Sequence, residues 1–281
     1  MKKGLVLEGG AMRELFSAGV MDVMLEKGLR FDCIVGVSAG ATFGCNYKSR
    51  QIGRTLRYNV KYCSDPRYGS FRSLLRTGDL YDVDFCYHQI PEKLDLFDEE
   101  TFQADPSAFF VVCTDCESGE PVYHQVKSGM GEDLEWIRAS ASMPLVSRVV
   151  EVAGKKLLDG GISDSIPLKF AQEQGCDRCV VVLTQPKGYV KKKSSLLGAM
   201  RLVLRSYPKV VEAMARRHEM YNETLRRIWQ QEELGRALVI CPPEALPVSR
   251  SEKDPEKLRQ AYRMGRQAAE EKLEELERFL A

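Results

Sequence analysis

The chain has 281 residues, of which 44% are hydrophobic and 29% are charged. This composition is typical of a globular protein and excludes a disordered or collagen-like chain. The 41 basic and 40 acidic side chains leave a net charge of +1, so no overall field favours nucleic acid as a partner. The longest apolar run, 108–113, is far shorter than a membrane span, and residues 4–7 are too few for a signal-peptide core. We therefore expect a cytoplasmic protein.

The first half of the chain alternates predicted strands and helices. A buried strand at 5–7 precedes a helix at 14–27, whose apolar residues form one stripe and which Gly28 ends as a C-terminal cap. A second strand at 31–35 leads into a helix that begins at Ser38. Residues 51–105 contain few strand runs and many aromatic side chains, which indicates helices and loops that cover the body.

Strand signals return in the second half, at 108–113, 122–126, 147–152, 156–158, 179–183 and 237–241. Helices are predicted at 134–142 and 167–174, followed by a long helical stretch after Pro186 and a last helix with an apolar stripe from Leu258 to Leu280. The repetition of strand, helix and strand predicts an α/β fold with a largely parallel sheet flanked by helices, and a C-terminal helical elaboration.

Nine cysteines form no regular framework, which is typical of a reducing compartment. Two pairs have the spacing of metal ligands, Cys113 with Cys116 and Cys176 with Cys179, and 59 residues separate the pairs. A zinc ribbon joins its pairs over short turns, whereas each of these pairs adjoins a strand. We therefore expect packing thiols and no metal site.

A G-x-S-x-G motif, Gly36 to Gly40 with Ser38 at its centre, lies between a predicted strand and a predicted helix. A strand–turn–helix elbow holds a nucleophilic serine in strained backbone geometry, needs small neighbours, and points a helix N-terminus at the hydroxyl. The alternative interpretation is a tight glycine turn with a serine that caps the helix.

Two further turns carry groups that suit the same chemistry. The first strand ends in Gly9, Gly10 and Ala11, followed by Arg13, and consecutive small residues expose backbone N–H groups as an oxyanion hole requires. The spacing is not that of a dinucleotide-binding loop. The strand at 156–158 ends in Asp159, Gly160 and Gly161, which places a carboxylate in a close-packed turn. Taken singly, either segment also fits an ordinary turn without a ligand.

These three motifs, together with Ala139-Ser140-Ala141-Ser142-Met143-Pro144, resemble in order and type those of the patatin-like phospholipase family and its bacterial acyl hydrolases. The resemblance covers 4–183. It departs from the family loop G-G-G-x-R-G at Ala11 and Glu14, which replace the third and last glycines. It implies a serine acyl-ester hydrolase of the phospholipase A type, with 1–185 as the catalytic core and 186–281 as a mainly helical C-terminal region packed on it.

The resemblance also implies a Ser–Asp dyad that needs no cofactor or metal. Ser38 attacks the ester carbonyl, Asp159 accepts its proton, and the N–H groups of Gly9, Gly10 and Ala11 hold the oxyanion. Arg13 holds that loop or contacts a lipid phosphate. The remaining motif positions, which give the close approach that the turns need, are Gly36, Gly40, Gly160 and Gly161.

Two other functions remain open from the sequence. An ordinary α/β-hydrolase would use Ser38, Asp159 and His218, which occur in the usual order. The serine follows only the second strand, however, and His218 lies in a charged helix, so the dyad is the preferred hypothesis. The third possibility is a non-catalytic patatin-like protein that binds lipid, since Glu14 would place a negative charge near an anionic site.

Charge is segregated along the chain although the total is near zero. Residues 187–227 contain eleven basic and three acidic side chains, a net charge of +8, interleaved with apolar residues around 196–204. This pattern suits a helix that lies on an anionic membrane surface, although a solvated helix whose apolar side packs on the sheet is the commoner origin of such a composition. The expected partners are a lipid or ester substrate and the inner face of the membrane, without nucleic acid. The oligomeric state is not indicated.

Overall fold

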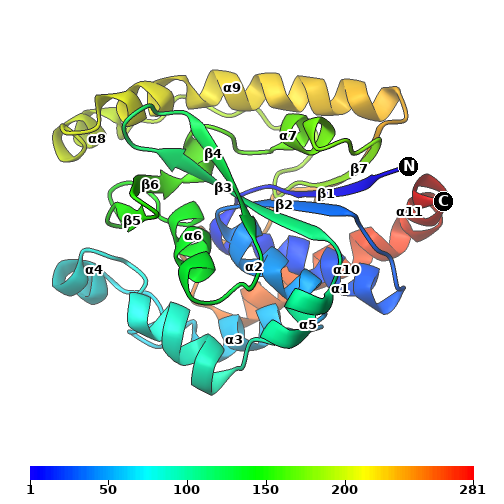
Figure 1. The fold of residues 1–281 in the computed structure, drawn as a ribbon, viewed down its shortest axis with the longest axis horizontal. Helices are drawn as coiled ribbons and strands as arrows, with labels where there is room; N and C mark the ends of the chain where they lie inside the picture. The colour runs from blue at the N-terminus through cyan, green and yellow to red at the C-terminus, as the bar shows by residue number, and fades with distance from the viewer.

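The computed structural model describes residues 1–281 and contains one eight-stranded sheet (Figure 1). The strands follow the order β5-β6-β3-β2-β1-β7-β8, and β4 pairs with β3 beside this path. The pairs among β3, β2, β1, β7 and β8 are parallel, whereas β4, β6 and β5 add antiparallel pairs. The strands are β1 Lys3–Leu7, β2 Cys33–Val37, β3 Ala108–Asp115, β4 Pro121–Val126, β5 Val150–Val152, β6 Lys155–Asp159, β7 Arg178–Val182 and β8 Ala237–Ile240.

Helices cover both faces of the sheet. One face carries α7 and α9, and the other carries α1, α2 and α10, with α3 outside them (Figure 1). The helices are α1 Leu15–Glu26, α2 Ala39–Lys48, α3 Arg54–Tyr62, α4 Phe71–Thr77, α5 Glu99–Ala104, α6 Glu132–Ser140, α7 Leu168–Glu173, α8 Leu197–Val203, α9 Pro208–Glu233, α10 Pro255–Glu271 and α11 Leu273–Leu280. Short 3₁₀ turns lie at Ala11–Glu14 and Gly160–Ile162, and a π-helix spans Phe85–Leu94. No helix is both long and apolar enough to cross a membrane.

The C-terminal helices pack on the N-terminal part of the chain. Helix α10 lies against α1, where the Tyr262 hydroxyl donates to Asp22 Oδ2 at 2.6 Å and Arg266 forms an ion pair with Glu26 at 2.8 Å. The sheet itself continues across the expected boundary at 185/186, because β8 extends β7 in parallel register. Residues from both ends of the chain therefore build one body.

The predicted α/β class is confirmed, with differences in detail. The sheet is parallel only in its central and β8-side part, because β3–β4 and β5–β6 are antiparallel hairpins. The helical stretch expected after Pro186 begins only at α8, and the single last helix is two, α10 and α11, divided at Lys272.

Candidate active site

Ser38 stands at the turn between β2 and α2. Its backbone has φ 56° and ψ −124°, a strained conformation for a residue with a side chain. A Cβ atom on Gly36 would lie 2.4 Å from the carbonyl oxygen of Gly40, so the turn closes only because Gly36 has no side chain. The Ser38 N–H donates to Ser140 Oγ at 2.9 Å, and Ser140 Oγ donates to the Val112 carbonyl at 2.6 Å. Hydrogen bonds that involve Ser140 of α6 and Val112 of β3 thus hold the turn at Ser38 in place.

Asp159 ends β6 directly beside this serine. Ser38 Oγ donates to Asp159 Oδ2 at 2.6 Å, and Asp159 Oδ1 accepts from the Gly161 N–H at 2.7 Å. Both side chains are buried, at 8% and 4% exposure. Burial raises the pKa of Asp159, and the Ser38 hydrogen bond and nearby Arg217 oppose that rise. Gly160 packs against β3 so closely that a Cβ would meet the Val112 carbonyl at 2.0 Å.

The glycine-rich loop after β1 borders the same serine. The backbone N–H groups of Gly9, Gly10 and Ala11 donate to no protein group. A Cβ added to Gly9 would lie 2.9 Å from the Cβ of Ser38, so this glycine packs directly against the serine. Ala11 has φ 51°, the left-handed region that the glycine at this place in the family loop adopts freely. These free donors next to a hydroxyl have the arrangement that a developing oxyanion needs.

The two charged residues of this loop differ in their surroundings. Arg13 is half-buried, and its Nε has no hydrogen-bond partner. Glu14 is fully buried, with both carboxyl oxygens unpartnered. Burial, and secondarily the nearby Glu8 carboxylate, hold the pKa of Glu14 well above 4.5. This shift favours the neutral acid, the form without a negative charge under the loop.

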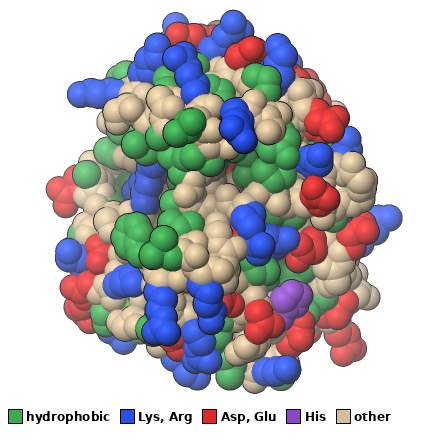
Figure 2. Space-filling model, turned by 90° about the vertical axis from the view of Figure 1, so that its left-hand side faces the viewer, with side chains coloured by type: hydrophobic (Ala, Val, Ile, Leu, Met, Phe, Trp, Pro, Cys, Tyr) green, Lys and Arg blue, Asp and Glu red, His purple; other side chains and the backbone are tan.

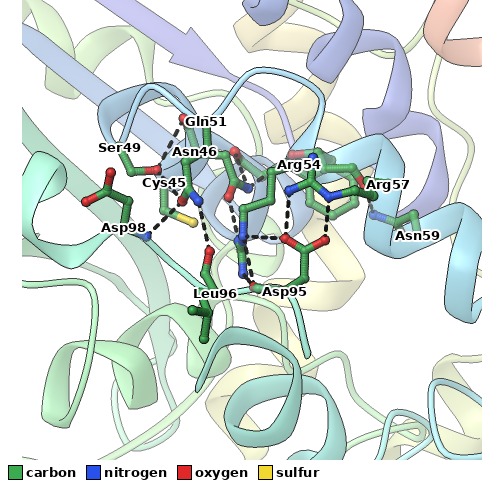
Figure 3. Close-up of polar contacts among 12 residues, drawn as sticks. Cys45, Asn46, Ser49, Gln51, Arg54, Arg57, Asn59, Asp95, Leu96 and Asp98 are labelled. Carbon is green, nitrogen blue, oxygen red and sulfur yellow. Dashed lines mark hydrogen bonds and ion pairs between the residues drawn. The ribbon is translucent and has the colours of Figure 1, made fainter. Parts of the chain in front are cut away.

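An apolar cavity of about 160 Å³ opens at Ser38 and extends towards α2, α3 and the π-helix. Of its 22 lining residues 17 are hydrophobic, which suits a hydrocarbon chain. The wall includes Phe43, Tyr58, Ile90, Phe97 and Met143. One charged residue, Arg54, also lines it, and its guanidinium is turned into a polar network with Asn46 and Asp95 (Figure 3).

The other candidate residues lie apart from the Ser38–Asp159 pair. None of the three histidines is hydrogen-bonded to it: His88 contacts Glu92, His124 contacts Asp133, and His218 Nε2 lies 3.7 Å from Glu219. All nine cysteines are free, and no group of three or more His, Cys, Asp or Glu side chains is arranged to hold a metal.

The motifs located the residues around the serine but missed two kinds of contact. Ser140, which receives the Ser38 N–H, lies in the segment 139–144 that the sequence singled out without a role for any residue. Arg217 of α9 donates from Nε to the Gly161 carbonyl, next to Asp159. It is one of eleven basic residues in 187–227, and nothing in the sequence separates it from the others.

The chain matches the family model described as "Patatin-like phospholipase" over residues 5–171, more than half of its length. It therefore belongs to this family of lipid acyl hydrolases and is a hydrolase of carboxylic ester bonds, as the motifs predicted. Residues 207–281 match a second model, described as a domain of unknown function, DUF6363.

The chain is also similar to two individual proteins. The uncharacterized protein YjjU of Escherichia coli (strain K12) is 28% identical over 275 residues, which cover 93% of this chain and 74% of that relative. The crystal structure of VipD from Legionella pneumophila aligns with a TM-score of 0.49 at 12% sequence identity, covering 98% of this chain and 67% of that one.

Proposed function

We propose that the chain is a phospholipase A-type acyl hydrolase that uses Ser38 and Asp159 as a catalytic dyad. Ser38 Oγ attacks the ester carbonyl and transfers its proton to Asp159, while the N–H groups of Gly9, Gly10 and Ala11 stabilise the tetrahedral oxyanion. Collapse of this intermediate forms the acyl-serine, and the leaving alcohol takes the proton from Asp159. Water then attacks the acyl-serine, gives its proton to Asp159, and the released serine recovers it.

The 2.6 Å hydrogen bond between Ser38 Oγ and Asp159 Oδ2 is the observation that carries this proposal. A carboxylate is a weak base for a serine, so it needs direct contact and a raised pKa. The burial of Asp159 raises its pKa. The triad with His218 lacks comparable support, because that histidine contacts Glu219 and has an unpartnered Nδ1.

Ser38→Ala and Asp159→Asn test the dyad. Ser38→Ala is expected to abolish hydrolysis of a p-nitrophenyl ester and labelling by a fluorophosphonate probe, because the nucleophile is lost. Asp159→Asn is expected to lower kcat by about 10²-fold or more, the scale of a positioned base. His218→Ala is the control and should leave kcat unchanged. Loss of activity in His218→Ala with normal kcat in Asp159→Asn would favour the triad, and absent labelling of the unmodified protein would favour a non-catalytic lipid-binding protein.

We also propose that the molecule contacts anionic membranes through α8 and α4. In and next to α8, the side chains of Leu196, Leu202 and Val203 are exposed. Helix α9, in contrast, packs its apolar side on the sheet. On α4, Phe71 and Leu75 are 78% and 90% exposed. Both helices lie on the left in Figure 1, the side that Figure 2 shows from the front, where hydrophobic side chains lie among Lys and Arg.

A further inference from the structure

Four basic side chains lie near one another beside Asp159, and none of them lines the apolar cavity. We call them the cation cluster: Arg13, Lys191, Arg217 and Arg250. Arg13 belongs to the glycine-rich loop, Lys191 to the segment after β7, Arg217 to α9, and Arg250 to the loop before α10. Four separate segments therefore bring positive charge to one place.

Two members contact the catalytic loops directly. Arg217 donates from Nε to the Gly161 carbonyl, and the N–H of the same Gly161 donates to Asp159 Oδ1. The Arg250 carbonyl accepts the N–H of Met12, next to Ala11, at 3.5 Å. The cluster is thus anchored both to the turn that carries Asp159 and to the loop with the free N–H groups.

Lys191 is held towards the same place by α9. Its N–H donates to Asn222 Oδ1 at 2.8 Å, and its carbonyl accepts from Asn222 Nδ2 at 3.0 Å. Its Nζ lies 4.0 Å from the centre of the Tyr221 ring, one helical turn from Arg217. Burial, and then the charge of Arg217, lower the pKa of Lys191 to about 7, so a bound anion would restore its positive charge.

The cluster has an excess of positive charge. None of its four members forms an ion pair with a carboxylate within 4.0 Å. The nearby Glu8 is already hydrogen-bonded to the Thr184 N–H at 2.7 Å and to the Tyr221 hydroxyl at 2.6 Å. Burial and the charges of Arg13 and Arg217 lower the pKa of Arg250. Mutual repulsion of this kind destabilises the empty cluster and is relieved by an anion.

We propose that the cation cluster binds the phosphate group of the substrate, an acyl ester of a glycerol phosphate whose acyl chain occupies the apolar cavity. Ser38 adjoins both sites: it lines the cavity, and its partner Asp159 is hydrogen-bonded to Gly161, whose carbonyl accepts from Arg217 of α9. Three guanidinium groups and an ammonium group match the several oxygens and the double charge of a phosphate monoester. This inference rests on the proposed function and adds the residues that select the phosphate-bearing ester.

Two members of the cation cluster lie in the C-terminal region, so this region takes part in substrate selection. Arg217 and Arg250 lie in residues 207–281, which match the domain of unknown function, and Lys191 lies outside both family matches. Residues 5–171 supply the dyad, the loop and Arg13. The phosphate preference therefore depends on residues that the patatin-like part of the chain does not contain.

The test compares two substrates with the same short acyl chain, a 1-acylglycerol 3-phosphate and the matching monoacylglycerol, below their micelle concentrations. The protein should hydrolyse the phosphate-bearing ester with the higher kcat/KM. Lys191→Met and Arg250→Gln should each reduce that preference about tenfold, the effect of losing one charge-assisted contact. Arg250→Lys should recover part of it. Lys253→Met, on an exposed lysine outside the cluster, is the matched control and should keep the full preference.

Inorganic phosphate separates a free ion from a head group. Competitive inhibition of monoacylglycerol hydrolysis by phosphate, weakened in Arg250→Gln, supports the site. Inhibition without any preference for the phosphate-bearing ester would overturn the head-group assignment in favour of free phosphate. Equal preference in all variants would overturn the inference while leaving the dyad intact. A protein that hydrolyses neither ester and does not label with a fluorophosphonate would instead contradict the proposed function.

Discussion

Glu14 occupies a place in the glycine-rich loop where a charged residue would oppose catalysis. A carboxylate within the first turn after the N–H donors would repel an oxyanion, but this side chain is fully buried and unpartnered. Its raised pKa means that the folded protein binds the carboxyl proton more tightly than the unfolded chain does. The stability that this tighter proton binding contributes is therefore fully present below 4.5, the pKa of the carboxyl in the unfolded chain. It is lost as the pH rises towards the pKa of Glu14 in the folded protein.

Glu14→Gln removes this ionisation while keeping the shape of the side chain. Relative to the unmodified protein, its free energy of unfolding should increase as the pH rises above 4.5, by up to about 1.4 kcal/mol per pH unit until the folded pKa is reached. Urea unfolding at a series of pH values measures the difference.

Glu26→Gln is the control with the opposite sign. Hydrogen bonds from Arg266 lower the pKa of Glu26, so its contribution is present above 4.5 and is lost at acid pH. If the difference in unfolding free energy between Glu14→Gln and the unmodified protein did not change with pH, the Glu14 carboxyl would have the same pKa in the folded and the unfolded state. That result would contradict this account of Glu14.

The site was predictable from the sequence where its parts are local. Ser38 and the loop Gly9–Ala11 each follow a strand, and their small neighbours reflect backbone contacts within a few residues of the motif. Lys191, Arg217 and Arg250 were not predictable, because three distant segments bring them together. Lys191 in particular is one of eleven basic residues in 187–227, and only the fold shows that its backbone is held by Asn222 and its Nζ lies over the Tyr221 ring.

At the scale of elements, a polar network fixes the wall of the apolar cavity. Arg54 at the start of α3 donates to Asn46 Oδ1 of α2 at 2.6 Å. It also donates to the carbonyl of Asp95, the residue that follows the π-helix, at 2.6 Å. Arg57 holds the Asp95 carboxylate from outside at 2.7 Å (Figure 3). Because Arg54 is buried whereas the Arg57 side chain is 55% exposed, the two ion pairs to one carboxylate should differ in strength.

Arg54→Met should lower the free energy of unfolding by about 3 kcal/mol, since it leaves a buried network without its cation. The same change at the exposed partner, Arg57→Met, should cost less than about 1 kcal/mol. Because Arg54 also lines the cavity, Arg54→Met should reduce kcat/KM for long-chain esters more than for acetate esters. Equal melting temperatures of the two variants would contradict this account of the cavity wall.

The strands were predictable from their apolar runs, whereas the direction of pairing needed the turns. Two residues, Ala153 and Gly154, both with positive φ, connect β5 to β6, and a five-residue loop with Gly119 connects β3 to β4. Both are hairpin signals that favour antiparallel neighbours. The division of α10 from α11 left no such signal, because Leu273 and Leu276 continue the apolar stripe across Lys272.

The whole molecule presents different surfaces at its two ends. The side with α4 and α8 carries exposed apolar side chains among Lys and Arg (Figure 2). Arg72 and Arg76 belong to α4, Arg201 belongs to α8, and Arg205 follows α8. The opposite end of α9 carries Leu234, which is 57% exposed. If the surface formed by α4 and α8 contacts an anionic membrane, the membrane that attracts this surface also supplies the substrate to the dyad.

Vesicle binding tests this arrangement. The protein should bind vesicles that contain phosphatidylserine at low ionic strength, bind neutral phosphatidylcholine vesicles far less, and dissociate towards about 0.5 M salt, where charges are screened within a few Å. Leu202→Ser and Leu75→Ser should each weaken binding about tenfold, because each removes one large side chain from the lipid interface. Leu234→Ser, the same change at the far end of α9, should bind as the unmodified protein does. Equal effects of all three substitutions would show that general surface hydrophobicity, and not the surface formed by α4 and α8, determines the binding.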